Sequence, residues 1–320
     1  MRQQIRVAFA YFWPGFMPDH FKGLFPYVYE KYDLVVSSSP EIVFHSVFSP
    51  QWRPYGDPTD RANLPRIRPG NYLRVFLTGE NMEPQMDQCD YALSFSALCD
   101  SPNHLRLPLW VYENRGNGQA PNRLVKDPAT DWEKVAHEKT RFCNFVYLHP
   151  VRFRDAIFTA VNAYKHVDAA GRCMNNMEGG WTVPTVPSRL AGKVEFFRKY
   201  KFTLAIENAI WPGYETEKLV DPVYAGSIPI YVGNPMARAT FDTSSYIDAT
   251  NFGTIKEMLE FVREVDNNRD LYFRMLATSF YRGNQIPDVA RDETVLAFFD
   301  RIFQTVFARR VMGARGAQMG

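Results

Sequence analysis

Lys218 occupies a position where a lysine is out of place unless an anion meets it. Thr216 is a predicted helix N-cap, which puts Glu217 and Lys218 in the first helical turn, beside backbone N–H groups without helical partners. These groups carry partial positive charge, so an anion stabilises this end of a helix and a cation does not. A phosphate between the helix end and the ammonium group satisfies both. We therefore interpret Lys218 as a diphosphate contact; the alternative is a solvated lysine on a surface helix.

An apolar strand and a loop must deliver this helix. Strand Phe202–Ile206 leads into Glu207 and Asn208, so two polar side chains follow a strand of a predicted α/β sheet, where ligands bind. Residues 209–213 form the loop, and a second apolar strand follows the helix. Pro222 falls inside the helix, where a proline removes a backbone hydrogen bond and predicts a kink.

The run from Lys201 to Pro235 resembles the donor-binding signature of the α-1,3/4-fucosyltransferases, glycosyltransferase family 10, and of its bacterial members in particular. That signature reads as an apolar strand, E-N, a loop, Y-x-T-E-K and then I-P-I-Y-x-G. Segments Leu73–Phe95, with its T-G-E-N, and Phe145–Arg172 also resemble the family. The loop Ala-Ile-Trp-Pro-Gly departs from the glycine- and tyrosine-rich loops of bacterial members, which leaves its sugar contacts open. The matching signature residues are Glu207, Asn208, Tyr214, Thr216, Glu217, Lys218, Ile228, Pro229, Ile230, Tyr231 and Gly233.

The resemblance implies transfer of fucose from GDP-fucose through a transition state with a positive sugar carbon and a negative departing diphosphate. It assigns the diphosphate to Lys218 and Arg154, with Arg152 as a competing choice for the second cation. Glu217 binds the donor through ribose, through fucose or by facing the positive carbon, and these alternatives stay open. The remaining donor contacts are Asn208 and Tyr214.

Glu80 is the predicted general base that removes the proton of the acceptor hydroxyl. It follows strand Tyr72–Leu77 and Gly79, a residue that lets the chain turn at the sheet edge. By the resemblance, Glu80 is the catalytic carboxylate of the family. Glu83 is its rival, and a structural role for Glu80, such as capping a helix over residues 81–86, is the other alternative.

The implied function is that of an inverting fucosyltransferase. It would move L-fucose to a hydroxyl of an N-acetylglucosamine or glucose unit in a lactosamine-type glycan, in α-1,3 or α-1,4 linkage. The expected partners are GDP-fucose and an oligosaccharide or glycolipid acceptor, as in protein or lipopolysaccharide glycosylation. Two alternatives are another nucleotide-sugar-dependent glycosyltransferase of the same fold and a non-catalytic glycan-binding module.

No cofactor is expected beyond the donor substrate. A metal-dependent transferase should show an Asp-x-Asp pair, and this chain has none. Cationic side chains and helix-end N–H groups would then hold the diphosphate, with a divalent cation at most stimulatory. The four cysteines, expected as free thiols, have no metal-binding spacing; they are Cys89, Cys99, Cys143 and Cys173.

Alternation of strands and helices predicts an α/β protein with parallel sheets covered on both faces. We therefore expect two facing Rossmann-like domains with an interdomain cleft, the GT-B type that the resemblance also implies. Residues 1–142 are predicted as the acceptor-side domain and residues 143–320 as the GDP-fucose-binding domain; whether the last helix packs back on the first domain stays open. Predicted strands include 5–12, 34–36, 42–44, 72–77, 91–95 and 145–148, and predicted helices include 20–32, 154–165, 255–265, 271–280 and 293–309.

The charge balance of the chain argues against one class of partner, nucleic acids. The 37 basic and 35 acidic residues nearly balance, whereas a nucleic-acid-binding surface normally shows a basic excess. The first residues contain neither a signal peptide nor a membrane span, because Pro14 and Gly15 break a short apolar run. We therefore expect a bacterial cytoplasmic enzyme without a transmembrane anchor; peripheral contact of the basic C-terminal tail with the inner membrane is the alternative to a disordered end.

Overall fold

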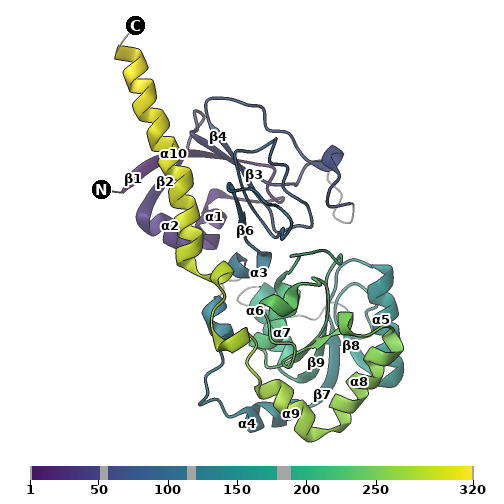
Figure 1. The fold of residues 1–320 in the computed structure, drawn as a ribbon. Coiled ribbons are helices and arrows are strands. Elements are labelled where there is room, and N and C mark those ends of the chain that lie inside the picture. Colours follow the sequence, from purple (N-terminus) through teal and green to yellow (C-terminus); the bar gives the residue numbers. More distant parts are fainter. Residues whose placement is uncertain (1, 51–56, 114–119, 179–188, 319–320) are drawn as a thin grey trace. The chain divides into compact units, whose positions relative to one another are not determined.

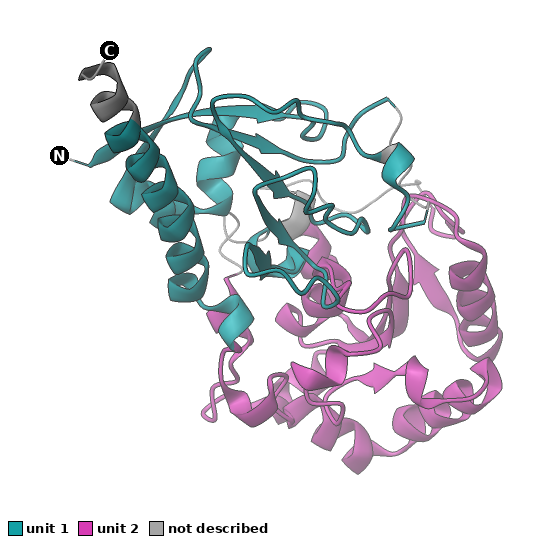
Figure 2. Cartoon of the chain, turned by 45° about the horizontal axis from the view of Figure 1, so that its top comes forward, with its two compact units in different colours: residues 1–116, 288–320 teal, residues 117–287 magenta. Residues whose placement is uncertain are grey.

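The computed structural model describes residues 2–50, 57–113, 120–178 and 189–318 (Figure 1). Contacts within the chain define two compact units (Figure 2): unit 1 contains residues 1–116 and 288–320, and unit 2 contains residues 117–287. Residues 120–142 group with unit 2 because, for example, the Lys126 backbone N–H donates to Asn284 Oδ1 at 2.9 Å. The domain limits predicted from the sequence, 1–142 and 143–320, differ from these units and stay a prediction.

Unit 1 is built on a six-stranded sheet in the order β2-β1-β3-β4-β5-β6. Every neighbouring pair is parallel. This is a doubly wound order: β2 lies on one side of β1 and the later strands lie on the other side, so the strand order reverses between β1 and β3. The strands are β1 (Gln3–Ala10), β2 (Tyr32–Val36), β3 (Ile42–His45), β4 (Leu73–Leu77), β5 (Tyr91–Ser94) and β6 (His104–Arg106).

The last helix of the chain, α10 (Asp292–Gln318), belongs to unit 1 and lies beside α2 (Pro26–Lys31) (Figure 1). Its Phe299 ring lies 5.2 Å from the ring of Phe25 and 6.2 Å from that of Phe44, measured between centroids. Farther along the helix, Arg310 Nε donates to Glu41 Oε1 at 2.5 Å. The C-terminal helix therefore contributes to the same apolar core as the first strands.

One predicted helix is two helices in the structure. The sequence predicts a single helix over residues 20–32, but α1 (Pro18–Leu24) ends before Phe25 and α2 begins at Pro26. Phe25 has φ −131°, outside the helical range. Pro26 causes the break, because a proline disfavours helical conformation at the preceding residue and suits the first position of a new helix. A short helix, α3 (Leu109–Tyr112), completes this unit.

Unit 2 has a five-stranded parallel sheet in the order β11-β10-β9-β7-β8. Its strands β9 and β10 are mostly apolar and buried along almost their whole length, as expected for a parallel sheet covered on both faces. The sheet reverses direction between β7 and β9. The strands are β7 (Arg141–Phe145), β8 (Val167–Ala169), β9 (Tyr200–Ile206), β10 (Ile228–Val232) and β11 (Ile247–Asp248).

Helices cover both faces of this sheet (Figure 1). Apolar side chains of α5 (Arg152–Tyr164), α8 (Ile255–Asn267) and α9 (Arg269–Ala277) share one core with the strands. Helices α6 (Arg189–Phe197) and α7 (Glu217–Tyr224) meet in a second, smaller cluster. Helix α4 (Trp132–His137) packs beside α9. The predicted helices over 154–165, 255–265 and 271–280 correspond to α5, α8 and α9.

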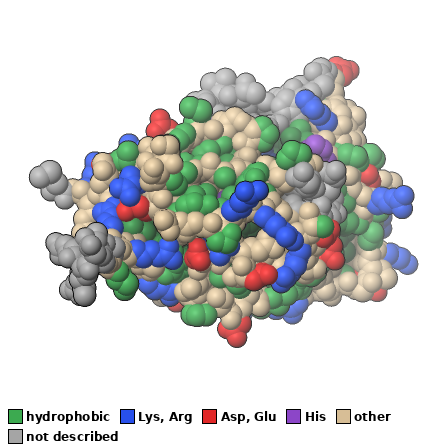
Figure 3. Space-filling model, turned by 90° about the horizontal axis from the view of Figure 1, so that it is seen from above, with side chains coloured by type: hydrophobic (Ala, Val, Ile, Leu, Met, Phe, Trp, Pro, Cys, Tyr) green, Lys and Arg blue, Asp and Glu red, His purple; other side chains and the backbone are tan. Residues whose placement is uncertain are grey.

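The surface carries mixed charge. On the face drawn in Figure 3, Lys and Arg side chains are spread among acidic and apolar ones, in keeping with the near balance of basic and acidic residues. Within the described ranges, the longest helices are too polar or too short to cross a bilayer.

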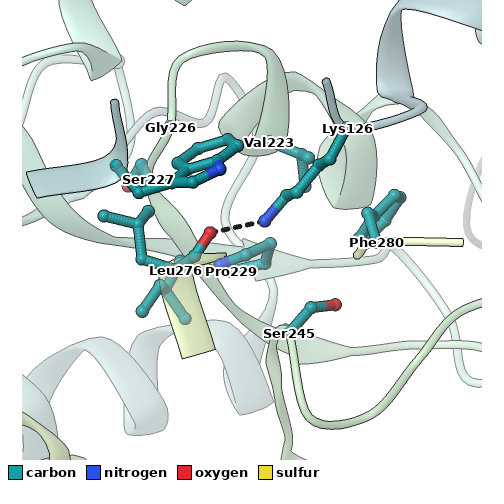
Figure 4. Close-up of a pocket in the computed structure, with 10 residues that line it drawn as sticks. Lys126, Val223, Gly226, Ser227, Pro229, Ser245, Leu276 and Phe280 are labelled. Atoms are coloured by element: carbon teal, nitrogen blue, oxygen red, sulfur yellow. Dashed lines mark hydrogen bonds between the residues drawn. The ribbon is translucent and has the colours of Figure 1, made fainter. Parts of the chain in front are cut away.

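A lysine lines a small cavity of about 20 Å³ at the start of β10 in unit 2, enough for roughly one water molecule. Lys126 Nζ donates to the Leu276 carbonyl at 2.5 Å and lies 4.4 Å from the centroid of the Trp132 ring. Figure 4 shows this hydrogen bond and the side chains around it. Burial lowers the pKa of Lys126 to about 8.

We expect Lys126→Met to change how stability depends on pH. In the wild type, the folded protein loses the Lys126 proton near pH 8 and the unfolded chain near 10.5. Between these values the unfolded chain binds more protons, so the free energy of unfolding rises with pH, by up to about 3 kcal/mol. Urea denaturation of both proteins at about pH 7 and about pH 10 measures the effect. A difference between the two proteins that does not change with pH would contradict it.

Candidate active site

The residues of the predicted donor site meet between β7 and β9, where the strand order of the unit 2 sheet reverses. Ligands of open α/β sheets bind outside the carboxyl ends of the strands at such a point. Arg154 reaches it from α5, which follows β7, and Asn208 comes directly after β9. The topology of the unit therefore points to the same place as the residue types.

Arg154 is held in one orientation. Its side chain is buried, its Nε donates to the Ile206 carbonyl at 3.1 Å, and its NH2 group donates to Asn208 Oδ1. The guanidinium carbon lies 4.4 Å from the centroid of the Tyr147 ring. The two hydrogen bonds use two of the five N–H donors of a guanidinium. Arg152, the competing assignment, is exposed at the start of α5.

Glu207 ties together the two ends of the loop after β9. Its carboxylate is wholly buried and accepts from the Thr216 backbone N–H at 2.8 Å. The Thr216 hydroxyl donates to the same carboxylate, 2.8 Å from Oε2. These hydrogen bonds place the first turn of α7 directly beside the end of β9.

Lys218 lies in the first turn of α7, as predicted, and Thr216 is the N-cap of that helix. The Thr216 hydroxyl accepts from the Lys218 backbone N–H at 3.4 Å. The ammonium group of Lys218 lies 3.2 Å from Glu217 Oε1 and 3.6 Å from Glu207 Oε2. Lys218 is therefore paired with two carboxylates in this structure. Pro222 lies inside α7, two residues before its end.

The charges of this cluster are strongly coupled. Burial raises the pKa of Glu207, against the attraction of Lys218. Burial opposes ionisation of Glu217 as well, but Lys218 and Lys193 outweigh it and lower the pKa of Glu217 to about 2. Burial also opposes the charge of Lys218, yet Glu217 and Glu207 raise its pKa well above the usual value. Glu217 and Lys218 are thus a charged pair at neutral pH.

Lys193 of α6 is a second cation in the cluster. Its Nζ lies 2.8 Å from Asp221 Oδ2 and 3.7 Å from Glu217 Oε1. Burial raises the pKa of Asp221 to about 6, against the attraction of Lys193. No sequence pattern singles out Lys193, because the segment before β9 carries no motif. Tyr147, on which Arg154 stacks, lies in a segment that resembles the family, but no pattern there singles it out.

Tyr214, a predicted donor contact, is buried. Only 1% of its surface is exposed, and its side chain raises the pKa of Lys218. Of the predicted site residues, unit 2 therefore brings together Arg154 with Asn208, and Tyr214 with Glu217 and Lys218.

Glu80, the predicted base, lies in unit 1 beyond the end of β4. It is partly buried, and its backbone N–H donates to Thr78 Oγ1 at 3.1 Å. Residues 81–86 form no helix, so Glu80 caps none. Burial raises the pKa of Tyr112, and the nearby carboxylates of Glu113 and Glu80 raise it further.

Glu83, the rival of Glu80, has different surroundings. Its backbone N–H donates to the Pro58 carbonyl at 2.8 Å. Burial raises the pKa of Cys99, and the charge of Glu83 raises it further. The two carboxylates are thus three residues apart in sequence but act on different neighbours.

Metal-binding groups of three or more His, Cys, Asp or Glu side chains do not occur among the residues that the structure describes. All four cysteines are free. Lys193, Lys218 and Arg154 are the cations at the carboxyl edge of the unit 2 sheet described above.

Two family models match the chain. The C-terminal model of glycosyltransferase family 10 (fucosyltransferase) matches residues 136–283, within unit 2. The N-terminal domain model of α-(1,3)-fucosyltransferase FucT matches residues 66–112, within unit 1 and around Glu80. Together they cover more than half of the chain.

Individual relatives agree with these matches. The chain is 26% identical to α-(1,3)-fucosyltransferase FucT of Helicobacter pylori over 300 residues, which are 85% of this chain and 59% of the relative. It is 34% identical to a putative fucosyltransferase of Acanthamoeba polyphaga mimivirus over 160 residues, 48% of this chain and 26% of the relative. The chain thus spans less than two thirds of the length of these relatives.

A solved structure shares the fold. An α1,3-fucosyltransferase crystallised with GDP superposes with a TM-score of 0.71 over 95% of this chain and 91% of that chain, at 23% sequence identity. The predicted α/β class with two Rossmann-like units, of GT-B type, is confirmed by this likeness and by the two parallel sheets. From both family models and from its relatives, the chain belongs to glycosyltransferase family 10, the fucosyltransferases.

Proposed function

We propose that the protein is an inverting fucosyltransferase that uses GDP-fucose as donor. The observation that carries this proposal is the arrangement of Arg154, Lys218 and the amino end of α7 around the point where the unit 2 sheet reverses direction. A similar solved α1,3-fucosyltransferase was crystallised with GDP-fucose. Guanidinium, ammonium and helix-end N–H groups are the donors that a diphosphate requires.

Donor binding would change the partners of Lys218. Without a ligand, Glu207 and Glu217 share its ammonium group. A diphosphate at the amino end of α7 would compete for that group and leave Glu217 available to the sugar. Glu217, with its low pKa, would stay ionised and could face either a hydroxyl or the positive sugar carbon.

In the reaction, the bond between the sugar carbon and the diphosphate oxygen breaks, and the acceptor oxygen bonds to that carbon. The electron pair of the broken bond leaves with GDP, whose charge Arg154 and Lys218 would stabilise. The acceptor proton would pass to the Glu80 carboxylate, the proposed general base. Asn208 and Tyr214 are proposed as further donor contacts.

The acceptor is proposed to be a lactosamine-type oligosaccharide or glycolipid, fucosylated in α-1,3 or α-1,4 linkage on N-acetylglucosamine or glucose. Unit 1 offers aromatic rings for such a sugar after β1: the partly buried Trp13 lies 4.9 Å from the partly buried Phe16 and 6.1 Å from the exposed His20, between ring centroids. Tyr11, next to them, has a left-handed φ of 58°, a strained conformation that is uncommon for an aromatic residue. The flat apolar faces of such rings can stack on a sugar.

We also propose that no metal is required, because the described cations can neutralise the diphosphate; a divalent cation would be at most stimulatory. The bacterial cytoplasm, with peripheral contact at the inner membrane, stays a prediction for the compartment. A different nucleotide-sugar transferase and a glycan-binding module are the competing functions.

One assay separates these functions. The protein is incubated with GDP-fucose, or with another nucleotide sugar in its place, and with lactose or lactosamine acceptors of both linkage types, with and without EDTA, and the products are identified by mass spectrometry and NMR. We expect a fucosylated α-1,3 or α-1,4 product, and most activity should survive EDTA. Transfer only from another nucleotide sugar, or glycan binding without transfer, would establish a competing function. Loss of activity in EDTA that manganese restores would contradict the metal-independent mechanism.

We expect Lys218→Met to weaken GDP binding by about 2 to 4 kcal/mol, because a charge-assisted contact to the diphosphate is lost. Lys201→Met is the matched control: Lys201 is also partly buried and paired with a carboxylate, Asp266 at 2.7 Å, but lies at the start of β9. Calorimetry measures the affinities, and thermal unfolding checks that both variants fold. Equal GDP affinity in Lys218→Met and wild type would move the donor site elsewhere.

We expect Glu80→Gln to lower turnover by roughly 10² to 10⁴, because an amide cannot accept the proton of the acceptor. GDP affinity should hardly change, since the proposed donor contacts all lie in unit 2. Glu83→Gln, three residues away, is the control and should keep most of the turnover. Near-normal transfer by Glu80→Gln would refute the assignment and point to Glu83 or to a carboxylate of unit 2, and a severe loss in Glu83→Gln alone would make Glu83 the base.

A further inference from the structure

Asn234 lies directly after β10 and the signature glycine, Gly233, and it is almost wholly buried. Its Oδ1 accepts from the Gly213 backbone N–H at 2.7 Å and from the Met236 backbone N–H at 2.9 Å. Its Nδ2 donates to Glu215 Oε1 at 2.5 Å. One side-chain amide therefore holds the loop after β9 at two points, Gly213 and Glu215.

The backbone of Asn234 is fixed as well. Its N–H donates to the hydroxyl of Tyr231 at 2.9 Å. A Cβ added at Gly233 would lie 2.3 Å from that hydroxyl oxygen and 2.5 Å from Glu207 Cγ, closer than real contacts allow. Only glycine lets Tyr231 and Glu207 approach this closely. The Tyr231-x-Gly233 part of the signature thus sets the place from which Asn234 reaches the loop.

The loop after β9 is held at two successive places. Glu207, at the end of β9, binds Thr216, and Asn234, at the end of β10, binds Gly213 and Glu215. Lys218 follows immediately in the first turn of α7. A shift of the segment from Gly213 to Glu215 would therefore move the amino end of α7, where the diphosphate is proposed to bind.

We propose that Asn234 is a positioning residue of the donor site, acting through the loop Gly213–Glu215 on Lys218 and the amino end of α7. This inference rests on the proposed use of GDP-fucose. The hydrogen bonds of Asn234 join it to Gly213, Glu215, Met236 and Tyr231, which are not among the proposed donor contacts. Its proposed effect is therefore on the placement of those contacts. The bond to Glu215 is the informative part, because a hydrogen bond to a charged group contributes more than a neutral one.

The first variant is Asn234→Asp. The new carboxylate still accepts from Gly213 and Met236, but it replaces an amide donor by a second carboxyl group, which repels Glu215 unless one of the two takes up a proton. We expect GDP to bind about tenfold more weakly or worse, and the KM for GDP-fucose to rise while the KM for the acceptor stays the same. Hydrogen exchange of the Gly213 amide should accelerate, since this N–H is part of the displaced loop.

The second variant adds Glu215→Gln to Asn234→Asp, which reverses the polarity of the pair. The glutamine amide can donate to the new carboxylate, and the pair again has one negative charge and one hydrogen bond. We expect GDP affinity and Gly213 exchange to return to within about threefold of the wild type. A role in stability alone would lower the melting temperature of Asn234→Asp without raising its KM for GDP-fucose.

Asn267→Asp is the matched control, because Asn267 also uses its side-chain amide, donating to the Arg263 carbonyl at 2.7 Å, but lies at the end of α8. If Asn234→Asp does not fold, Asn234→Ser takes its place, since serine cannot reach Glu215 and adds no charge. GDP affinity within about twofold of wild type in a folded Asn234 variant, or no recovery in a folded double variant, overturns the proposal. Wild-type protein that binds no GDP would instead refute the proposed function.

Discussion

A carboxylate buried at the end of β9 constrains the rest of the proposed donor site. Glu207 is wholly buried, and an ionised carboxylate cannot be buried without hydrogen bonds and a nearby positive charge. Thr216 supplies the hydrogen bonds and Lys218 the charge. Both residues sit at the start of α7, so neutralising Glu207 places that helix end next to the strand.

The strand order of unit 2 gives this arrangement its chemical meaning. Helix α5 and the loop after β9 leave the sheet on either side of the reversal between β7 and β9. Arg154 bridges the two, because it starts from α5 and binds the end of β9. Its guanidinium and the amino end of α7 therefore depend on the same short stretch of backbone, Ile206 to Asn208.

Local sequence predicted much of this and failed at specific places. Thr216 as N-cap, the strands before Glu207 and after α7, and the helices α5, α8 and α9 follow from patterns within a few residues. The prediction of one helix over residues 20–32 was wrong, because Pro26 ends α1 and begins α2. Partners distant in sequence, such as Asn234 for Gly213 or Lys193 for Asp221, could not be predicted, because only the folded sheet brings their elements together.

The late position of α10 in the chain affects how the protein is made. During synthesis, residues 117–287 of unit 2 leave the ribosome complete, while unit 1 still lacks Phe299 and Arg310. Domains generally fold as units while they are synthesised. The ring of Phe299 can therefore reach Phe25 and Phe44 only after all of unit 2 has been synthesised. A unit whose two parts lie on either side of another unit needs protection from aggregation until both parts have been made.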